Sequence, residues 1–563
     1  MDLPRLNWFL PGSIPDDIDT ELSSYSPAFR SVLYQRNLCT EDEVLNFLLP
    51  KEPPWFSSQL PLNSDKACKI IQSAIENDEV IAVYGDYDAD GITSTAMLTL
   101  ALSKVSDKVI SYIPNRFTEG YGLNREALSS LSDEGVSLVI TVDNGIRSFD
   151  EVKYANSLGL KVIISDHHTP ETTLPPAIAI INPKLPNDSY PDENLSGAGV
   201  TFKLITALSK IYSSLNPSDY LDLVAIGSVA DVVPLVGENR YLVRKGLSSL
   251  NQIQRQGVLS LLGASSLVPG KIRSSDISFQ IGPRLNSSGR LGSADIPLKL
   301  LLSQDAQICG DLAQIIDNHN FQRKKISQEL LGKAELQLKK EEPLPFIFFA
   351  LDHDFHLGVA GIAAGVLARK YHVPVIVGTI GPEYTTASCR SIPEFNLISA
   401  LDYCEDLFVR YGGHSQAAGF TIANENVSEL RNRLAVLAEK ELSNLDLRPS
   451  IFVDAITSLD QLNASLYSEL DKLEPTGCQN PEPIFLTTNL SATQVKVIGQ
   501  DGDHLKMKVS DGILTLDAIG FGLGFISDNI PSKFDAVYTF KLNEYRGKKS
   551  FQLQISDLKP ANN

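Results

Sequence analysis

Three aspartates stand at alternate positions in VYGDYDADGIT, residues 83–93. Asp86, Asp88 and Asp90 are too close together for three free carboxylates, because like charges at this spacing repel one another. A bound divalent cation is the simplest way to offset that repulsion, since hard cations prefer oxygen ligands. The triplet therefore indicates a cation site.

A calcium-binding loop also has acids at positions 1, 3 and 5 and a glycine at position 6, as this stretch does. Such a loop requires a bidentate glutamate at position 12, where this chain has Met97. The preceding run VIAVYG is apolar and rich in β-formers, which is typical of a buried strand and not of the helix that precedes a calcium loop. We therefore expect the three acids at the carboxyl end of a strand, where open α/β sheets build their ligand sites.

Two further strand-like runs end in groups that can bind a metal. SLVITVD ends at Asp143, and KVIISD ends at Asp166, which His167 and His168 follow. Alone, an aspartate after a strand is usually a turn or cap residue, and a histidine is more often structural than a ligand. Parallel strands would bring all three ends to one edge, which indicates a shared site. Oxygen-rich ligands with one imidazole favour Mn²⁺ or Mg²⁺ over structural Zn²⁺.

A fourth acid lies in the apolar stretch LVAIGSVADVVPL. Burying Asp231 there would be costly unless it is paired or bound to a metal. The alternative interpretation is that Asp231 caps the N-terminus of a helix.

The elements that must hold these residues alternate between strand and helix. Helical patterns follow the first two strands, at 91–105 and 148–159, and the second begins with a possible capping box of Ser148 and Glu151. This alternation predicts a parallel sheet with helices on its faces.

The rest of the chain divides by pattern. Residues 1–60 are expected to be irregular and proline-rich. The stretch 304–342 has no proline and only two glycines, which predicts one long helix or two consecutive ones. PFIFFALD and VPVIVGTI flank a helix of small residues and predict a second α/β lobe. From about 451 onward the pattern is all-β, alternating around a turn at Asp511-Gly512, and predicts a small barrel.

Composition limits the class of protein. The 563 residues are too many for one core. We find no basic-then-apolar leader and no run that could span a bilayer, and the six cysteines lack CxxC spacing. We therefore expect a cytoplasmic protein in a reducing compartment, with no membrane partner. The net charge of −19 argues against indiscriminate nucleic-acid binding, but the segment from Lys533 to the C-terminus is net basic.

The ordered motifs GDYDADG, VDNG, SDHH and GSVADVVPL resemble those of the DHH phosphoesterase superfamily. The flanking segments resemble the bacterial RecJ family of single-stranded-DNA-specific exonucleases within it: YIPNRFTEGYGLN, LSGAGVTFKL, GPRLNSSGRL, SCRSIPEFNL, YGGHSQAAGF, HLKMKV and NEYRGKKSFQLQI. The resemblance runs from about Trp55 to Leu558.

The resemblance implies a fold of five segments. A parallel-sheet DHH lobe and a second α/β lobe are joined by a long helix, and an all-β OB-fold domain follows. The expected segments are an N-terminal segment at 1–60, the DHH phosphoesterase domain at 61–250, a helical connector at 251–342, a DHH-associated substrate-binding domain at 343–445 and a nucleic-acid-binding OB-fold at 450–563.

The resemblance also implies roles for single residues. Two divalent cations, Mn²⁺ or Mg²⁺, would be held by Asp86, Asp88, Asp90, Asp143, His167 and Asp231, with Asp143 bridging the ions and Asp86 either a ligand or a supporting acid. His168 would face the phosphate, and the catalytic set is Asp88, Asp90, Asp143, His167, His168 and Asp231. Asp166 would orient a histidine. Arg116, Ser388 and Arg390 match a pocket for the 5′-terminal phosphate, while Arg284, Asn286, Arg290 and His414 match contacts to the nucleotide end or the scissile phosphate.

The implied function is a metal-dependent 5′-to-3′ exonuclease that converts single-stranded DNA to 5′-mononucleotides in DNA repair and recombination. We expect a monomer that works with a single-strand-binding protein and a helicase. Another DHH phosphodiesterase acting on short oligonucleotides would generally be shorter and lack the connector and barrel. A non-catalytic DNA-binding relative would have lost metal ligands, and all the matched ones are present here.

Some positions depart from the family pattern or allow two interpretations. Tyr84 stands where many relatives carry a further histidine ligand, so metal affinity or preference is open. Thr476 and Gln479 replace Phe and Gly of a family PFGxGNPEP run, in a segment that we expect to be structural. Three aromatic residues of the barrel are candidates to stack on bases or, as is more common, to fill its core: Phe452, Tyr545 and Phe551.

Overall fold

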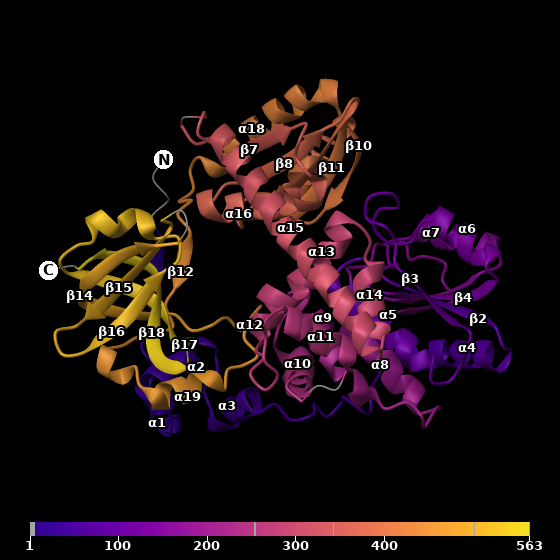
Figure 1. Cartoon of the computed structure of the whole chain (residues 1–563), viewed down its shortest axis with the longest axis horizontal. Helices are drawn as coiled ribbons and strands as arrows, with labels where there is room; N and C mark the ends of the chain where they lie inside the picture. Colours follow the sequence, from indigo (N-terminus) through magenta and orange to yellow (C-terminus); the bar gives the residue numbers. More distant parts are fainter. Residues whose placement is uncertain (1–5, 253–254, 342, 500–501, 546, 562–563) are drawn as a thin grey trace. The chain divides into compact units, whose positions relative to one another are not determined.

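The computed structural model describes residues 6–252, 255–341, 343–499, 502–545 and 547–561 (Figure 1). The described chain forms two compact units. The larger contains Leu10–Asp317 and the segment from Phe452 onward, and the smaller contains Asn318–Ile451 with the few described residues before Leu10. In the described parts of the chain, no helix combines the length and the apolar character needed to cross a membrane.

The larger unit contains the expected parallel sheet. Its strand order is β3-β2-β4-β5-β6, and every neighbouring pair is parallel. The strands are β2 (Val80–Tyr84), β3 (Val109–Tyr112), β4 (Val136–Val142), β5 (Lys161–Ser165) and β6 (Ala179–Ile181). The prediction from the sequence is confirmed for β2, β4 and β5, and we refer to this part of the unit as the DHH lobe.

Helices cover both faces of this sheet. One core contains Val83 and Ile140 and lies under α4 (Ser64–Glu76), α5 (Ala89–Leu102), α8 (Gly197–Ser209) and α9 (Leu221–Ala230). The other contains Ala82 and Val139 and lies under α6 (Arg125–Asp133) and α7 (Phe149–Ser157). Burial on both faces explains the continuous apolar strands. The expected capping box at α7 is wrong, because the Ser148 side chain makes no capping hydrogen bond.

Helices continue the larger unit beyond α9. They are α10 (Gly237–Leu250), α11 (Gln256–Ala264), α12 (Ser274–Asp276), the short π-helix η2 (Ile277–Ile281), α13 (Gly282–Leu291) and α14 (Asp295–Leu302). The predicted long helix is one uninterrupted element, α15 (Ala306–Leu338), with a length of about 50 Å. It carries the chain from the larger unit into the smaller.

The smaller unit is the expected second α/β lobe, with a mixed sheet. Its strand order is β10-β11-β9-β8-β7, in which β7 and β8 are parallel and the other pairs antiparallel. The strands are β7 (Phe348–Asp352), β8 (Val375–Ile380), β9 (Tyr384–Arg390), β10 (Phe408–Gly413) and β11 (Ala417–Ala423). One face packs on α16 (Leu357–Tyr371) and the end of α15, and the other on α17 (Leu397–Asp402) and α18 (Val427–Leu442).

The last part of the chain forms a closed five-stranded, OB-like barrel. The strand order is β14-β15-β16-β18-β17, and β14 also pairs with β17 to close it. The strands are β14 (Phe485–Ile498), β15 (His504–Ser510), β16 (Thr515–Gly520), β17 (Phe534–Tyr545) and β18 (Lys548–Pro560). The predicted turn at Asp511-Gly512 joins β15 to β16. The all-β expectation was incomplete, because the helix α19 (Ala464–Asp471) precedes the barrel.

The expectation of an irregular start to the chain is wrong. Three helices occupy it: α1 (Asp16–Glu21), α2 (Pro27–Gln35) and α3 (Glu41–Leu48). Thr40 and Glu43 form a capping box at the start of α3, a signal that the proline-rich surroundings obscured. Phe29 and Leu48 share one core with barrel residues such as Phe534. The first and last segments of the chain therefore fold together, and we refer to them as the barrel module.

Candidate metal centre

Three neighbouring parallel strands end at one place in the larger unit. The acids of the DYDAD stretch follow β2, Asp143 follows β4, and Asp166 with the two histidines follows β5. The structure groups potential ligand atoms there into three sets, each with all atoms within 4.8 Å of one another. These sets are Asp86, Asp88 and Asp143; Asp90, His167 and Asp231; and Asp143, His167 and His168.

His167 lies at the centre of these groups. Its Nε2 is 3.0 Å from Asp143 Oδ1, 3.5 Å from Asp231 Oδ2 and 3.9 Å from Asp90 Oδ2. Burial, and then the nearby charge of His168, lower the pKa of His167 to about 3. His167 is therefore neutral near physiological pH and keeps a lone pair for a metal ion.

Several buried polar atoms at this centre lack a hydrogen-bond partner among the described residues. They are Asp86 Oδ1, Asp143 Oδ1 and His167 Nε2. Burial and then repulsion from neighbouring acids raise the pKa of Asp86, Asp143 and Asp231 well above its usual value. Unpaired buried acceptors and crowded carboxylates are what bound cations would satisfy, so this donor set fits Mn²⁺ or Mg²⁺.

Asp90 is fixed by a neighbouring helix. Its two carboxylate oxygens accept hydrogen bonds from Gly197 N (2.7 Å) and Ala198 N (2.9 Å) at the start of α8. A Cβ at Gly197 would lie 2.6 Å from Asp143 Oδ1, and one at Gly227 of α9 would lie 2.6 Å from Asp90 Oδ1. These two glycines let α8 and α9 approach the acids. The motifs LSGAG and GSVADVVPL contain these glycines, but the sequence did not show what the glycines contact.

Asp88 is fixed by its own helix. It is the N-cap of α5 and accepts hydrogen bonds from Asp90 N and Gly91 N, each at 3.0 Å. Asn286 Oδ1 of α13 accepts from Ala89 N at 2.7 Å. Asn286, for which the resemblance implied a substrate contact, holds the start of α5.

The backbone sets the positions of Asp143 and Asp231 in different ways. Asp143 has φ 63°, a left-handed conformation that is costly for an aspartate and typical of functional sites. Asp231 follows the last residue of α9, and its N–H donates to Gly227 O. The alternative of a helix N-cap at Asp231 is therefore wrong: it is a C-cap, and its carboxylate joins the acid cluster.

Asp166 orients His168. Its Oδ1 lies 2.7 Å from His168 Nδ1, and its carboxylate also accepts the backbone N–H groups of Ile146, His167 and His168. Burial alone would raise the pKa of Asp166, but the hydrogen bond and charge of His168 outweigh it and lower the pKa to about 2. In turn, Asp166 outweighs burial and raises the pKa of His168. The pair thus favours a cationic His168, whose side chain is 33% exposed.

Tyr84 points away from the metal centre. Its ring is buried in the core under α6 and α7 and stacks on Tyr112 with centroids 5.0 Å apart. Its hydroxyl donates to Gly122 O and accepts from Asn124, each at 3.1 Å. Tyr84 is therefore a core residue and offers no ligand to the centre.

Among the expected substrate residues of the larger unit, Arg116 and Arg290 act on the DYDAD stretch, whereas Arg284 contacts other parts of the protein. The Arg116 guanidinium lies over the Tyr87 ring at 5.1 Å, and Arg290 acts electrostatically on Tyr87. Arg284 Nε donates to Asp317 Oδ1 at 2.9 Å, and its Nη1 donates to Gln280 O at 3.1 Å. These hydrogen bonds within the protein fix the Arg284 side chain.

The expected substrate residues of the smaller unit lie beside one another. Ser388 and Arg390 share one face of β9, where a Cβ at Gly361 of α16 would lie 3.0 Å from Arg390 Nη2 and 3.5 Å from Ser388 Cβ. In the strand register, Arg390 of β9 lies opposite Ala417 of β11. His414 N donates to Ala417 O at 2.8 Å. This cluster can present a cation and a hydroxyl to an anionic group.

The barrel aromatics differ in their surroundings. Phe551 packs with Tyr467 and Phe540, at ring-centroid distances of 5.8 and 4.9 Å, so it belongs to the core side. Phe452 is 67% exposed and remains a candidate for stacking. The Tyr545 side chain lies outside the described residues.

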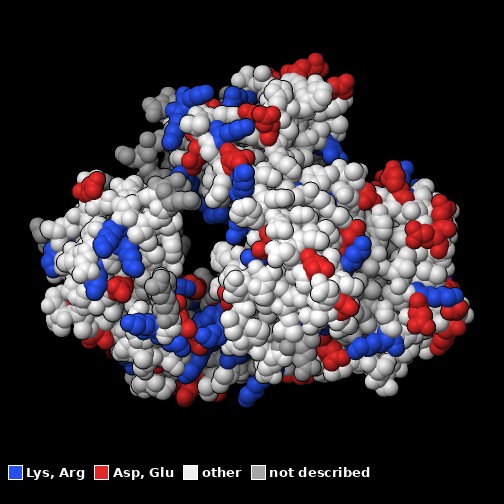
Figure 2. Space-filling view, viewed as in Figure 1, with Lys and Arg blue, Asp and Glu red and all other residues white. Residues whose placement is uncertain are grey.

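Basic side chains gather on the barrel although the chain is acidic. Figure 2 shows this group of lysines and arginines, and the strand register places Lys496 of β14 opposite Lys506 of β15. Like charges opposite one another on a sheet are unfavourable without an anionic partner. This face of the barrel can therefore attract a phosphate backbone.

Comparisons with known proteins agree with these features. Family models match at 80–228 (DHH family, N-terminal domain), 343–440 (DHHA1 domain) and 453–557 (RecJ OB domain). The chain is 37% identical over 559 residues to the single-stranded-DNA-specific exonuclease RecJ of Bacillus subtilis (strain 168), covering 98% of this chain and 71% of that protein.

Two solved structures extend the similarity to the fold. Crystal structures of RecJ from Thermus thermophilus in complex with Mn²⁺ and with Mg²⁺ each align with 99% of this chain. They give TM-scores of 0.85 and 0.79, identities of 27% and 25%, and coverage of 80% and 79% of those chains. The resemblance inferred from the motifs is thereby confirmed.

Proposed function

The chain belongs to the RecJ family of single-stranded-DNA-specific exonucleases, and from this premise we propose that it hydrolyses single-stranded DNA with Mn²⁺ or Mg²⁺, starting at a 5′ end and releasing 5′-mononucleotides. The observation that carries the proposal is the cluster of buried carboxylates around His167, with its unpaired acceptor atoms. Asp86, Asp88, Asp90, Asp143, His167 and Asp231 would hold two ions. When bound, two ions supply an activated water and offset the charge of an in-line displacement.

The chain's own residues divide the remaining work. α8 and α5 fix Asp90 and Asp88, so these ligands need little reorganisation on binding. Asp166 keeps the proton on His168 Nδ1, and a cationic imidazole beside the acids stabilises the negative phosphate. The 5′-terminal phosphate would be bound by Arg116, Ser388 and Arg390. Binding of that phosphate would make hydrolysis begin at the 5′ end of the strand.

The wider setting is also part of the proposal. All six cysteines are free thiols, which supports a reducing compartment such as the cytoplasm. The substrate would come from a helicase and a single-strand-binding protein, and the enzyme would act as a monomer in repair and recombination.

Asp143→Ala tests the metal centre. Removing this ligand should lower the hydrolysis of single-stranded DNA more than about 100-fold, because even residues that only orient a ligand typically cost about 10–100-fold. Asp150→Ala, at an exposed acid of α7, should leave the rate unchanged. Hydrolysis by Asp143→Ala at the wild-type rate would reject the assigned site.

Arg390→Ala tests the 5′-phosphate pocket. The ratio of the rates on 5′-phosphorylated and 5′-hydroxyl strands should fall about tenfold or more, since a charged hydrogen bond to phosphate is lost. Arg410→Ala, an exposed arginine on β10 of the same sheet, serves as the matched control and should keep the ratio. An unchanged ratio in Arg390→Ala would remove this residue from the pocket.

A further inference from the structure

The first turn of α10 carries three consecutive buried polar side chains: Glu238, Asn239 and Arg240. This helix belongs to the DHH lobe, because Leu242 and Val243 lie in the core of that lobe. Buried polar groups are costly unless each finds partners. The partners of Arg240 lie in another part of the larger unit.

Arg240 makes five hydrogen bonds, all to backbone carbonyl oxygens, and is 2% exposed. Its Nε donates to Phe47 O at 2.8 Å. Its Nη1 donates to Leu473 O and Pro475 O at 3.0 and 3.1 Å. Its Nη2 donates to Lys472 O and Glu474 O at 3.4 and 3.2 Å. Five bonds use the full donor capacity of an arginine.

These carbonyl oxygens lie at the ends of two helices and in the segment just beyond one of them. Phe47 lies in the last turn of α3, and residues 472–475 directly follow α19. The last carbonyl groups of a helix lack partners within it and form the negative end of its dipole, so a buried cation suits them. Arg244, one turn further along α10, donates to Leu48 O and Glu474 O.

The two helices belong to the barrel module, whereas the arginines do not. Leu48 of α3 and Leu466 of α19 lie in the core shared with the barrel, and that core is separate from the core of the DHH lobe. Arg240 and Arg244 therefore join two hydrophobic cores through buried and partly buried hydrogen bonds. Leu235 N adds to the contacts between the two parts by donating to Cys478 O at 2.9 Å. The segment with Thr476 and Gln479 thus lies at the junction of the two parts.

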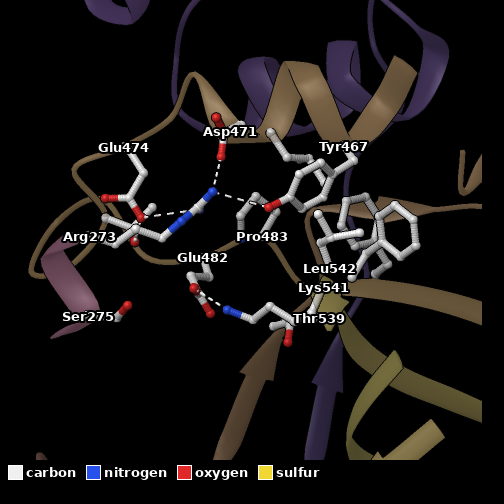
Figure 3. Close-up of a pocket in the computed structure, with 14 residues that line it drawn as sticks. Arg273, Ser275, Tyr467, Asp471, Glu474, Glu482, Pro483, Thr539, Lys541 and Leu542 are labelled. Carbon is white, nitrogen blue, oxygen red and sulfur yellow. Dashed lines mark hydrogen bonds and ion pairs between the residues drawn. The ribbon is translucent and has the colours of Figure 1, made fainter. Parts of the chain in front are cut away.

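A pocket lies near the contacts between the DHH lobe and the barrel module. It has a volume of about 160 Å³ and is lined by residues of α12, α19 and β17 (Figure 3). Across it Arg273 bonds to Asp471 and to the Tyr467 hydroxyl, and Lys541 pairs with Glu482. These ion pairs are partly exposed, and such pairs contribute little. The arginines, by contrast, are buried (Arg240) or half-buried (Arg244). Without them the carbonyl groups of Phe47, Leu48, Lys472 and Glu474 would lose these donors, whereas Leu473 O and Pro475 O would keep Asn480.

We propose that Arg240 is a positioning residue that docks the barrel module onto the DHH lobe, so that one DNA strand can engage the barrel and the metal centre together. This inference rests on the proposed exonuclease function. A strand long enough to occupy both gains affinity from the second, tethered contact, and a strand too short to reach the barrel gains nothing. Arg240 would thereby set the preference for long over short strands without touching the substrate.

Arg240→Lys tests the docking by kinetics. Lysine keeps the charge but has three donors in place of five. For a single strand of about 30 nucleotides, KM should rise about tenfold while kcat changes less than about twofold. For a trinucleotide, kcat/KM should stay within about twofold of wild type. The exposed Lys245 lies on the same helix, and Lys245→Ala should leave KM and kcat unchanged for both substrates.

Trypsin gives a second readout that does not depend on activity. Lys472 lies in the segment that Arg240 holds, so cleavage after Lys472, identified by mass spectrometry, should be faster in Arg240→Lys than in wild type and Lys245→Ala. Should Arg240→Lys fail to fold, Asn480→Ala replaces it, because Asn480 Nδ2 donates to Leu473 O and Pro475 O from the barrel side. The same direction of change is expected.

The outcomes separate the two claims. The docking role would be overturned if trypsin cleaved after Lys472 equally fast in Arg240→Lys and wild type. It would also be overturned if Arg240→Lys lost kcat/KM equally on the long strand and on the trinucleotide. If the wild-type chain hydrolyses no single-stranded DNA, the proposed function fails, and the trypsin comparison still decides whether Arg240 docks the barrel module.

Discussion

At the scale of single residues, the centre is defined by charges that the protein leaves uncompensated. Asp90, Asp143 and His167 are almost fully buried. Structural carboxylates at such depth are normally paired with cations or saturated with hydrogen bonds. Asp166 shows the saturated case, because its carboxylate accepts bonds from His168 and three backbone N–H groups. Asp143 shows the other case, which favours an ion.

Removal of the metal ions should make stability fall as pH rises. Burial, and then the charge of Asp88, raise the pKa of Asp90 to about 7 in the folded, metal-free chain. A carboxyl group whose folded pKa is raised contributes full stability below its unfolded pKa of about 4, and loses it as pH rises through about 7. In EDTA, Tm should therefore be lower at about pH 8 than at about pH 5.5, and added Mn²⁺ should raise Tm more at the higher pH.

Asp90→Asn is the control for this measurement. The amide cannot ionise, so the difference in Tm between the two pH values in EDTA should shrink. A metal-free wild-type protein whose Tm rises between the lower and the higher pH would contradict the assignment of crowded, buried acids.

At the scale of elements, the centre depends on helices that approach one another closely. The acids follow parallel strands, but their orientation is set by the start of α8 and the end of α9, whose Gly197 and Gly227 have no side chain to keep the helices apart. A helix N-terminus also favours a carboxylate such as Asp90 through its free N–H groups.

Gly197→Ala should damage the centre more than the fold. The added Cβ would lie 2.6 Å from Asp143 Oδ1, so either Asp143 or α8 must shift. We expect the affinity for Mn²⁺, measured by titration calorimetry, to fall about tenfold or more, since misplaced ligands typically cost about 10–100-fold.

Gly263→Ala provides a matched control for this substitution. Gly263 lies within α11 and an added Cβ meets no atom within 4 Å, so alanine should raise stability by about 0.4–1 kcal/mol and leave metal affinity unchanged. Unchanged metal affinity in Gly197→Ala would mean that α8 does not position the acids.

The sequence predicted the elements whose signals are local. The central strands β2, β4 and β5 and the long α15 followed from apolar runs and from the lack of proline. The three N-terminal helices did not, because they are short and their apolar faces are completed by the barrel core, which is formed by segments far along the chain. The contacts of Gly197 and the orientation of Tyr84 were likewise invisible, since both depend on segments far apart in the chain. The five segment boundaries and the role of each site residue stay predictions.

At the scale of the whole molecule, charge is distributed unevenly. The chain carries a net charge of −19, yet basic side chains gather on the barrel (Figure 2). The negative net charge disfavours non-specific adsorption to nucleic acid, while a local basic face can track a phosphate backbone. We propose that a two-metal centre in the DHH lobe acts on strand ends that are selected by their 5′ phosphate and held by the barrel.

The most direct test of that account is digestion, with Mn²⁺, of single strands that carry a label at either the 5′ or the 3′ end. A 5′ label should appear at once as a mononucleotide, a 3′ label should remain on a strand that shortens gradually, and the matching duplex should resist. Release of the 3′ label first, or internal cleavage of a strand with both ends blocked, would contradict the account.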